Sequence, residues 1–292
     1  MKRHFQFLSF ALSLVAVLFL TSCSKEELAN PDGSISERGL TSFTTFSASL
    51  IGLTADNRLV HFNTARPTAT RSVTITGLPA GERLLGIDVK PGTSTVYAVS
   101  SSSLLYQINA STGVASVIST RPFDPLLEGT MTGFDYNPTD ATIRIVNDMG
   151  QNLRVSPLTG DVVGVDVALT PDSITIGAMA VSQGISGKNV STMYDIDPVS
   201  GILYRQNFNS GMLSPIGNLG VRVLSEVGFD ISAKGYGFAV FEGQGQQTGA
   251  GGPDSASGSV ATAAYRVWQV NLDSGTVRPL AVVEPMIGLT AL

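Results

Sequence analysis

The chain has 292 residues, of which 43% are hydrophobic and 14% charged, and its formal net charge is −5. An acidic chain is a poor nucleic-acid binder, because that affinity rests mainly on Lys and Arg side chains that contact phosphates. With one cysteine and two histidines in the whole sequence, a disulfide framework is excluded, and a His-rich metal centre or a His-dependent catalytic triad lacks partners.

The N-terminus predicts an export signal. Met1-Lys2-Arg3-His4 is basic, and an apolar run broken only by three polar residues follows it up to Leu20. This run is closer to the roughly 7–15 residues of a signal-peptide core than to the roughly 20 of a membrane-spanning helix. It ends at Leu20-Thr21-Ser22-Cys23, which resembles the bacterial lipobox. We therefore predict a signal peptide over 1–22 and lipid attachment, with palmitate, at Cys23; the alternative is an uncleaved anchor with a buried cysteine.

A polar segment follows the cysteine. Residues 23–46 are rich in Ser and Thr and carry a Pro31-Asp32-Gly33 turn, which predicts a flexible tether. Ser24-Lys25-Glu26-Glu27 resembles the tag of Bacteroidota surface lipoproteins, although an ordinary polar tether would have the same composition. Cleavage removes Lys2 and Arg3, two of 18 basic residues, and changes the formal charge from −5 to −7. We expect an outer-membrane lipoprotein displayed at the cell surface.

From residue 47 onward one pattern repeats. An apolar-Gly-x-x motif recurs at Gly86, Gly133, Gly177 and Gly228, with spacings of 47, 44 and 51 residues. Each unit holds short segments rich in β-branched residues and bounded by Gly, Pro, Asn or Asp, which predict strands and hairpins. No helical periodicity persists beyond the signal peptide. Four strands every roughly 45–50 residues indicate the blades of an all-β propeller.

The ends of the repeat region predict how the ring closes. The first unit has a second strand at 47–54, a third at 57–62 and a fourth at 71–76, but no first strand. Residues 285–290 have the first-strand pattern and no successors. We expect them to complete the first blade and remove its exposed edge. The domain over 47–292 then has five four-stranded blades; splitting the 177–225 region would give six. In the fifth unit, 242–263 is predicted to be a loop.

Several stretches carry a family resemblance. Gly52-Leu53-Thr54-Ala55-Asp56-Asn57-Arg58-Leu59, Gly133-Phe134-Asp135-Tyr136-Asn137-Pro138 and the stretch 146–154 resemble an uncharacterised family of secreted bacterial proteins, domain of unknown function 4394. Shorter matches lie at 191–197 and 228–231. The resemblance spans roughly residues 49–292, and Gly-Gln-Asn-Leu-Arg at 150–154 is its most specific part. It implies the fold and the exported setting, and it implies no activity.

Three carboxylates occupy repeated positions. Asp88, Asp135 and Asp230 each follow the repeated glycine by two residues on a first strand, so Gly and Asp share one side of that strand. They could form an axial cluster that holds Ca²⁺, another divalent cation or a sugar hydroxyl. Alternatively, each accepts hydrogen bonds from backbone N–H groups in the following turn. We favour the second interpretation, because a repeat copies its architecture whereas a binding site is usually asymmetric.

An asymmetric candidate lies in the third unit. Asp148, Gln151, Asn152 and Arg154 crowd a predicted hairpin and could bind a polar ligand or a peptide. The structural alternative is that they form the turn and that Arg154 pairs with Asp148 or a neighbouring acid.

Two weaker features remain. His61, the one histidine beyond the signal peptide, is expected to be a strand residue that faces solvent or a neighbour. Ser173 and Ser255, in Asp-Ser-Ile and Asp-Ser-Ala triplets, resemble Bacteroidota O-glycosylation acceptors.

The sequence therefore favours a lipid-anchored, non-enzymatic propeller that binds a protein, peptide or glycan at the envelope without a cofactor. The alternative is a metal-dependent hydrolase or lactonase that uses axial carboxylates such as Asp135, Asp230 and Glu226. A purely structural role in an envelope assembly is a third option.

Overall fold

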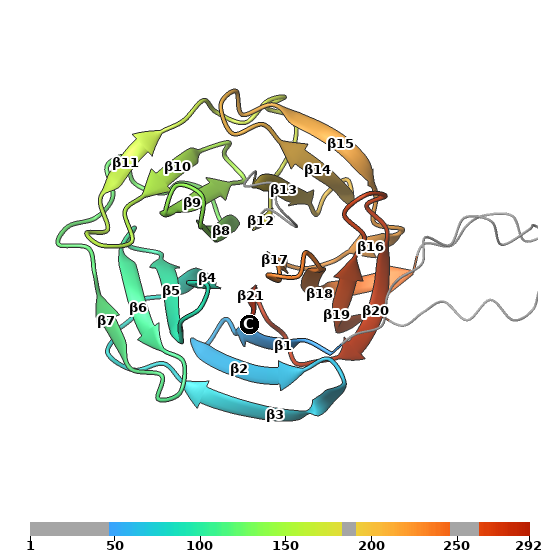
Figure 1. Ribbon diagram of the computed structural model, residues 1–292, viewed down its shortest axis with the longest axis horizontal. Coiled ribbons are helices and arrows are strands. Elements are labelled where there is room, and N and C mark those ends of the chain that lie inside the picture. Colours follow the sequence, from blue (N-terminus) through green and yellow to red (C-terminus); the bar gives the residue numbers. More distant parts are fainter. Residues whose placement is uncertain (1–46, 183–190, 246–262) are drawn as a thin grey trace, which may run out of the picture. The chain divides into compact units, whose positions relative to one another are not determined.

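The computed structural model describes residues 47–182, 191–245 and 263–292, which form five antiparallel sheets around a common axis (Figure 1). Blade 1 holds β21 (Gly288–Ala291), β1 (Ser49–Leu53), β2 (Arg58–Asn63) and β3 (Arg66–Thr74). Blade 2 holds β4 (Leu84–Val89), β5 (Thr95–Ser100), β6 (Leu105–Asn109) and β7 (Ala115–Val117). Blade 3 holds β8 (Thr132–Asn137), β9 (Thr142–Asn147), β10 (Asn152–Val155) and β11 (Val162–Val165).

Blade 4 holds β12 (Ala178–Ser182), β13 (Thr192–Asp197), β14 (Ile202–Gln206) and β15 (Leu213–Asn218). Blade 5 holds β17 (Gly228–Ile231), β18 (Gly237–Gly245), β19 (Ala264–Val270) and β20 (Val277–Val282), with the short β16 (Val221–Val223) beside β18. The predicted five-bladed propeller is confirmed. Region 177–225 supplies a single blade and β16, so the six-blade alternative is wrong.

The C-terminal strand closes the ring as predicted. β21 pairs antiparallel with β1, with Leu53 opposite Gly288 and Leu50 opposite Ala291. Met286, just before β21, is fully buried, and its sulfur fills the space beside Gly52 where a Cβ would collide with it. Blade 1 is therefore built from both ends of the described chain, and its inner edge is not exposed.

Each junction between neighbouring blades has its own apolar cluster. Leu59 and Val96 share one between blades 1 and 2, and Tyr97 and Ile145 share the next. Further clusters join blades 3 and 4, blades 4 and 5, and blades 5 and 1. Burial of apolar side chains is the main favourable term in folding, so no blade is stable without its neighbours. Among the described residues no helix could span a membrane.

One predicted loop begins later than expected. β18 continues through residue 245 and β19 begins at Ala264, so residues 242–245 are strand and not loop. The two strands pair out to Gly243 opposite Ala264. The prediction was wrong there because Gly and Gln carry little strand propensity, while the pairing with β19 and β16 holds them extended.

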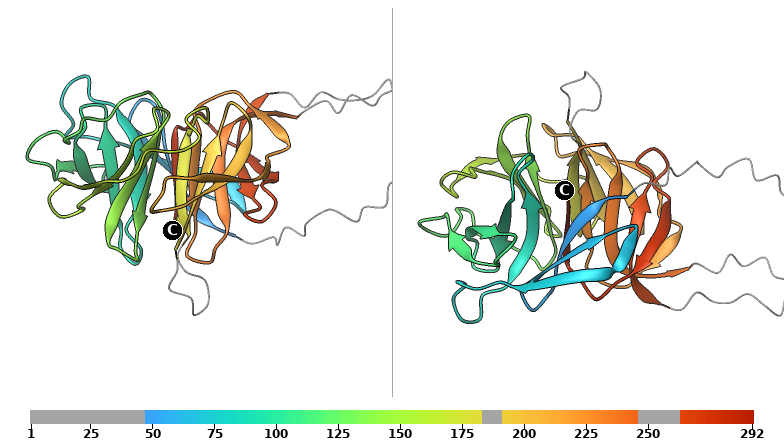
Figure 2. Two further views of the ribbon diagram at one scale, coloured as in Figure 1. Left: turned by 90° about the horizontal axis from the view of Figure 1, so that it is seen from above. Right: turned by 60° about the horizontal axis from the view of Figure 1, so that its bottom comes forward.

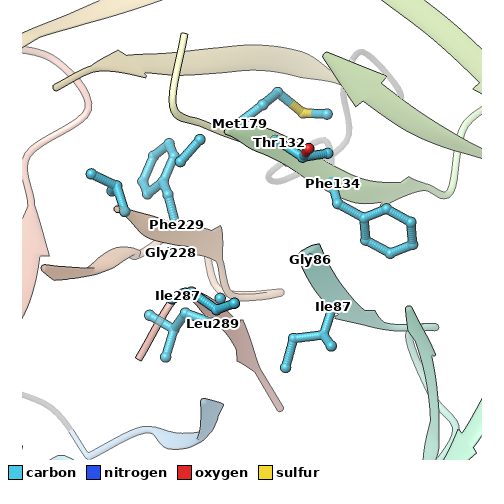
Figure 3. Close-up of a pocket in the computed structure, with 13 residues that line it drawn as sticks. Gly86, Ile87, Thr132, Phe134, Met179, Gly228, Phe229, Ile287 and Leu289 are labelled. Carbon is cyan, nitrogen blue, oxygen red and sulfur yellow. The ribbon is translucent and has the colours of Figure 1, made fainter. Parts of the chain in front are cut away.

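The repeated glycines lie where the inner strands meet. Gly86, Gly133, Gly228 and Gly288 line a narrow space at the centre of the ring, together with Ala178 (Figure 3). This space is about 10 Å³, and a Cβ added to Gly228 would lie 2.6 Å from the backbone of Gly288. Glycine is therefore needed for close approach of neighbouring strands. At this level the axis is packed and not an open channel.

The glycine constriction divides the axis into two ends. The inner strands β4, β8, β12, β17 and β21 all start at one end of the axis and finish at the other, because the residues at their starts line one pocket and the residues at their ends line another. Figure 2 (left) shows the ring edge-on. We call the end where they begin the leading end and the end where they finish the acidic end.

Candidate functional site

The three axial carboxylates gather at the acidic end. Asp88 of β4, Asp135 of β8 and Asp230 of β17 all line a cavity of about 240 Å³, which also borders the turn 91–93 and the C-terminal Leu292. The three side chains are 6%, 3% and 5% exposed. The three carboxylates therefore lie around one cavity, and they are buried at its wall.

Each of these carboxylates accepts a hydrogen bond from the backbone of the next blade. The N–H of Tyr136 donates to Asp88 Oδ2 at 2.8 Å, and the N–H of Val181 donates to Asp135 Oδ2 at 3.1 Å. The N–H of Ala291 donates to Asp230 Oδ2 at 2.6 Å. The repeated aspartate thus ties one blade to its neighbour. The sequence had predicted bonds to the following turn, and the partner in the next blade had no local signal.

Thr290 takes the aspartate position in blade 1. Its Oγ1 accepts from the N–H of Val89 at 3.1 Å and donates to Asp88 Oδ1 at 2.8 Å. The N–H of Val89 also donates to Asp88 Oδ1 at 2.7 Å. Both oxygens of Asp88 are therefore engaged by neighbouring donors.

Blade 4 breaks the pattern with Ala180. The N–H of Val181 donates to the preceding blade, as the N–H of Tyr136 does. Tyr136 directly follows Asp135, so Ala180, which directly precedes Val181, stands at the aspartate position of blade 4. The residue that matches the repeated glycine is then Ala178 and not Gly177, so the alignment from sequence was one residue off in this blade. Ala180 offers no acceptor, and the N–H of Ile231 donates to Asp230 Oδ1 of its own blade at 2.5 Å.

Restoring the missing acceptor is expected to stabilise the propeller. A hydroxyl introduced by Ala180→Ser would stand where Thr290 has its own, able to accept from the N–H of Ile231 and to donate to Asp230. A hydrogen bond of this kind contributes about 1 kcal/mol. Urea unfolding should therefore give a midpoint above that of the wild type. Ala178→Ser, at the packed constriction, is the control and should not raise it.

The pKa values of all three carboxyls lie above their usual range. Burial is the main cause, and it raises the pKa of Asp230 to about 6. Burial together with the charge of Asp230 raises the pKa of Asp88 well above normal. Burial and the charges of Asp88 and Asp230 do the same to the pKa of Asp135. Backbone N–H donors act in the opposite direction but do not offset desolvation.

Asp135 and Asp230 affect each other's protonation. Their interaction raises the pKa of Asp135 and lowers that of Asp230. Two buried carboxyls that interact in this way titrate as a pair.

The three axial carboxylates are arranged to accept hydrogen bonds and not to hold a cation. Among the described residues no group of three or more His, Cys, Asp or Glu side chains is arranged to hold a metal ion. Ca²⁺ takes six to eight oxygen ligands. Both oxygens of Asp88 and of Asp230 already accept hydrogen bonds from N–H or O–H groups.

Glu226 does not join the axial carboxylates. It precedes β17 and lines a separate pocket at the leading end with Arg83 and Thr130. The glycine constriction lies between this pocket and the cavity of Asp135 and Asp230. The grouping of these three acids expected for a hydrolase is therefore wrong in its geometry.

The hairpin candidates of blade 3 do not form one site. Asp148 accepts from the N–H of Thr130 at 3.0 Å and from its Oγ1 at 2.9 Å. Gln151 accepts from the N–H of Glu128 at 2.8 Å and donates to the carbonyl of Leu126 at 2.9 Å. Both side chains therefore fasten the connection between blades 2 and 3 to this hairpin.

The other two candidates of that hairpin point elsewhere. Asn152 is 1% exposed and donates to the carbonyl of Val167 at 3.1 Å. Arg154 pairs with Asp166, Nη2 to Oδ1 at 2.9 Å, and Arg144 contacts the same carboxylate at 2.8 Å. Arg154 thus has a neighbouring acid as its partner, and the acid is not Asp148.

Buried polar side chains also meet between blades 3 and 4. Asp195 is fully buried, which raises its pKa well above the usual range. With the Gln206 amide oriented to suit its neighbours, Nε2 donates to both oxygens of Asp195 at 3.2 and 3.1 Å. Its oxygen then accepts from Asn152 at 3.2 Å. These residues hold two blades together.

His61 lies at the junction of blades 1 and 2. His61 is half-buried, and its Nε2 contacts the carbonyl of Ala110 in blade 2 at 2.8 Å. Burial lowers its pKa. Ser173 is exposed between blades 3 and 4. Cys23, the tether and Ser255 lie outside the described residues.

Comparisons with known proteins give a family and a distant structural match. A family model described as "Domain of unknown function (DUF4394)" matches residues 58–291. No curated protein matches the chain. One similar solved structure is titled "YCF48 bound to D1 peptide", with 11% identity and a TM-score of 0.39. The alignment covers 82% of this chain and 64% of that one, so the chain spans less than two thirds of its length. A likeness at this level transfers no ligand.

Proposed function

The chain belongs to the family described as Domain of unknown function (DUF4394), and from its own residues we propose a non-enzymatic propeller that binds a partner at the cell envelope. One observation carries the proposal. The aspartates that could do chemistry accept hydrogen bonds from the backbone of the next blade, so they serve the ring and not a substrate. A rigid ring with variable connecting loops is a common binding scaffold.

The leading end offers the surface for binding. Large apolar side chains are exposed in its loops, among them Leu126, Met149 and Val199, which are 58%, 63% and 79% exposed. Val199 also lines a groove of about 490 Å³ at this end, and exposed apolar side chains beside a groove often mark interaction sites. We place partner binding at this end.

Site-specific crosslinking on intact cells tests this placement. A photoreactive side chain at Val199 of the full-length protein should give a discrete crosslinked product. Leu158 is the matched control, because it is 84% exposed in the turn between β10 and β11, at the acidic end. Equal products from both positions, or none from Val199, would contradict the proposal.

The proposal that the protein lies at the cell envelope rests on its N-terminal sequence. The Leu-Thr-Ser-Cys stretch that ends at Cys23 supports lipid attachment, and Lys25-Glu26-Glu27 supports surface display. Metabolic labelling with palmitate should mark the wild type and not Cys23→Ala. Protease added to intact cells should degrade the domain if it is displayed outside.

The hydrolase alternative has one observation in its favour. The acidic cavity is roughly 240 Å³, and it borders Asp230, whose pKa of about 6 suits a general acid. Stoichiometric Ca²⁺ or Zn²⁺ in the purified protein, lost in Asp135→Ala with the fold intact, would favour this alternative. Purified protein free of bound metal would count against it.

A further inference from the structure

The innermost strand of blade 5 is in two pieces. β17 pairs with residues 237–240 of β18, and β16 pairs with residues 243–245 along the same edge. Residues 224–227 connect the two pieces. β16 thus extends the inner edge of blade 5 beyond β17 at the leading end.

The outer edge of β16 presents unpaired backbone groups. The N–H of Leu224 donates to the carbonyl of Glu242 at 2.9 Å, so these two residues form a hydrogen-bonded pair. Arg222 and Gln244 lie opposite each other two residues further along and form the next such pair. In an antiparallel ladder such pairs alternate with pairs whose N–H and C=O groups point outward. The backbone of Val221 and Val223 therefore faces away from β18. Within the ranges that the structure describes, no second strand pairs with this edge.

A groove runs along this free edge. Its volume is about 490 Å³, and it is lined by residues 221–225, by the blade 4 turn 198–201 and by Met131. Gly201 of this turn lies close to the carbonyl of Val221, so the open part of the edge is at Val223. Val199 and Leu224 are exposed there, at 79% and 39%. Apolar side chains beside free backbone donors and acceptors suit an extended peptide, because strand addition uses both.

The charge of the groove indicates which side chains the bound peptide would carry. Arg222 is the one charged residue that lines it, is exposed, and has no ionic partner among the described residues. No acidic residue lines the groove, so the charge of Arg222 is not offset there. Charge complementarity favours an acidic side chain opposite Arg222.

We propose that the groove along β16 binds an extended, acidic segment of a partner protein as an added strand. The backbone of Val223 hydrogen-bonds the segment, its acidic side chain pairs with Arg222, and its apolar side chains contact Val199 and Leu224. This proposal rests on the proposed binding function and names its partner class. Three residues of edge make a small interface, which is typical of transient complexes.

The sharpest variant removes one outward donor. Val223→Pro deletes an N–H that β18 does not use, and proline is tolerated on strand edges. Val165→Pro is the matched control, since Val165 is 64% exposed on the outermost strand β11. The N–H of Asp166 donates to the carbonyl of Asn152, so the backbone of Val165 faces outward in the same way. Equal thermal unfolding curves for both variants and the wild type establish that the fold is retained.

The probe is a displayed library of linear ten-residue peptides, selected on the full-length lipoprotein in detergent. We expect enriched peptides with an acidic residue between apolar residues at alternate positions. Their affinity should fall at least tenfold in Val223→Pro and in Arg222→Glu, and should stay unchanged in Val165→Pro. No enrichment, or affinity equal in Val223→Pro and the wild type, would overturn the proposal. A wild-type dimer that Val223→Pro converts to a monomer would also overturn it, in favour of a second copy.

The two proposals fail in distinguishable ways. If the Val199 crosslink persists on cells in Val223→Pro, a partner binds the leading end by another mode, and only strand addition is wrong. If neither Val199 crosslinks nor peptide enrichment is found, the binding function itself is wrong.

Discussion

Removal of residues 285–292 is expected to unfold the whole propeller and not only its first blade. Met286, Leu289 and Thr290 are buried, and loss of a buried Leu or Met side chain costs about 2–5 kcal/mol. Without Thr290 and Ala291, Asp88 and Asp230 lose donors inside the protein, at about 1–3 kcal/mol each. These losses approach the 5–15 kcal/mol by which a domain of this kind is stable.

Circular dichroism and urea unfolding of the truncated protein provide the measurement. We expect no cooperative transition, together with association through the open edge of β1. Thr290→Val is the graded control, because it keeps the strand and its shape but leaves the N–H of Val89 without the hydroxyl. It should unfold cooperatively with a loss of about 1–3 kcal/mol. A truncated protein that melts within a few degrees of the wild type would contradict the closure role of β21.

Periodicity explains why so much of the fold was predictable. The first unit lacks its first strand, and the C-terminal segment is a first strand with no further strands after it. Each supplies what the other lacks, so both the number of blades and the closure of the ring could be predicted from the sequence. The one-residue error in blade 4 has a local cause: Gly177 stands next to Ala178, and a search for glycine selects the wrong neighbour. Only the N–H of Val181, which donates to Asp135, reveals the correct position.

The candidate site was predictable in its members but not in its role. Repetition located Asp88, Asp135 and Asp230, yet their partners lie 48, 46 and 61 residues away in the next blade. No local pattern encodes such a contact. The groove along β16 was missed for a related reason, because a three-residue strand is too short for alternation to be visible.

Asp135→Asn is expected to stabilise the propeller at pH 8 and to reduce the decline of its stability between pH 5 and 8. The pKa values of Asp88, Asp135 and Asp230 are raised in the folded protein, so the fold retains protons that the unfolded chain releases near pH 4. The free energy of unfolding therefore falls as the pH rises above about 4, and for Asp230 the fall ends near its pKa of about 6. One pKa unit corresponds to about 1.4 kcal/mol, so Asp230 alone accounts for about 2–3 kcal/mol.

The amide that Asp135→Asn introduces stays neutral at every pH. Its oxygen can accept from the N–H of Val181, as the carboxyl of Asp135 does. Urea unfolding at pH 5, 6.5 and 8 measures the effect: the variant should match the wild type at pH 5 and exceed it by about 1–3 kcal/mol at pH 8. His61 acts in the opposite direction, because burial lowers its pKa and acidification then destabilises the fold, but its contribution is the same in both proteins.

Asp172→Asn is the control for the loss of a negative charge, because Asp172 is exposed in the connection between blades 3 and 4. It should leave the difference between pH 5 and pH 8 as in the wild type. The opposite result at Asp135 would be informative. If Asp135→Asn is less stable than the wild type at pH 8, the ring needs a negative charge there, which a bound cation would explain. The acidic cavity would then be a ligand site, and the hydrolase alternative would replace the binding module.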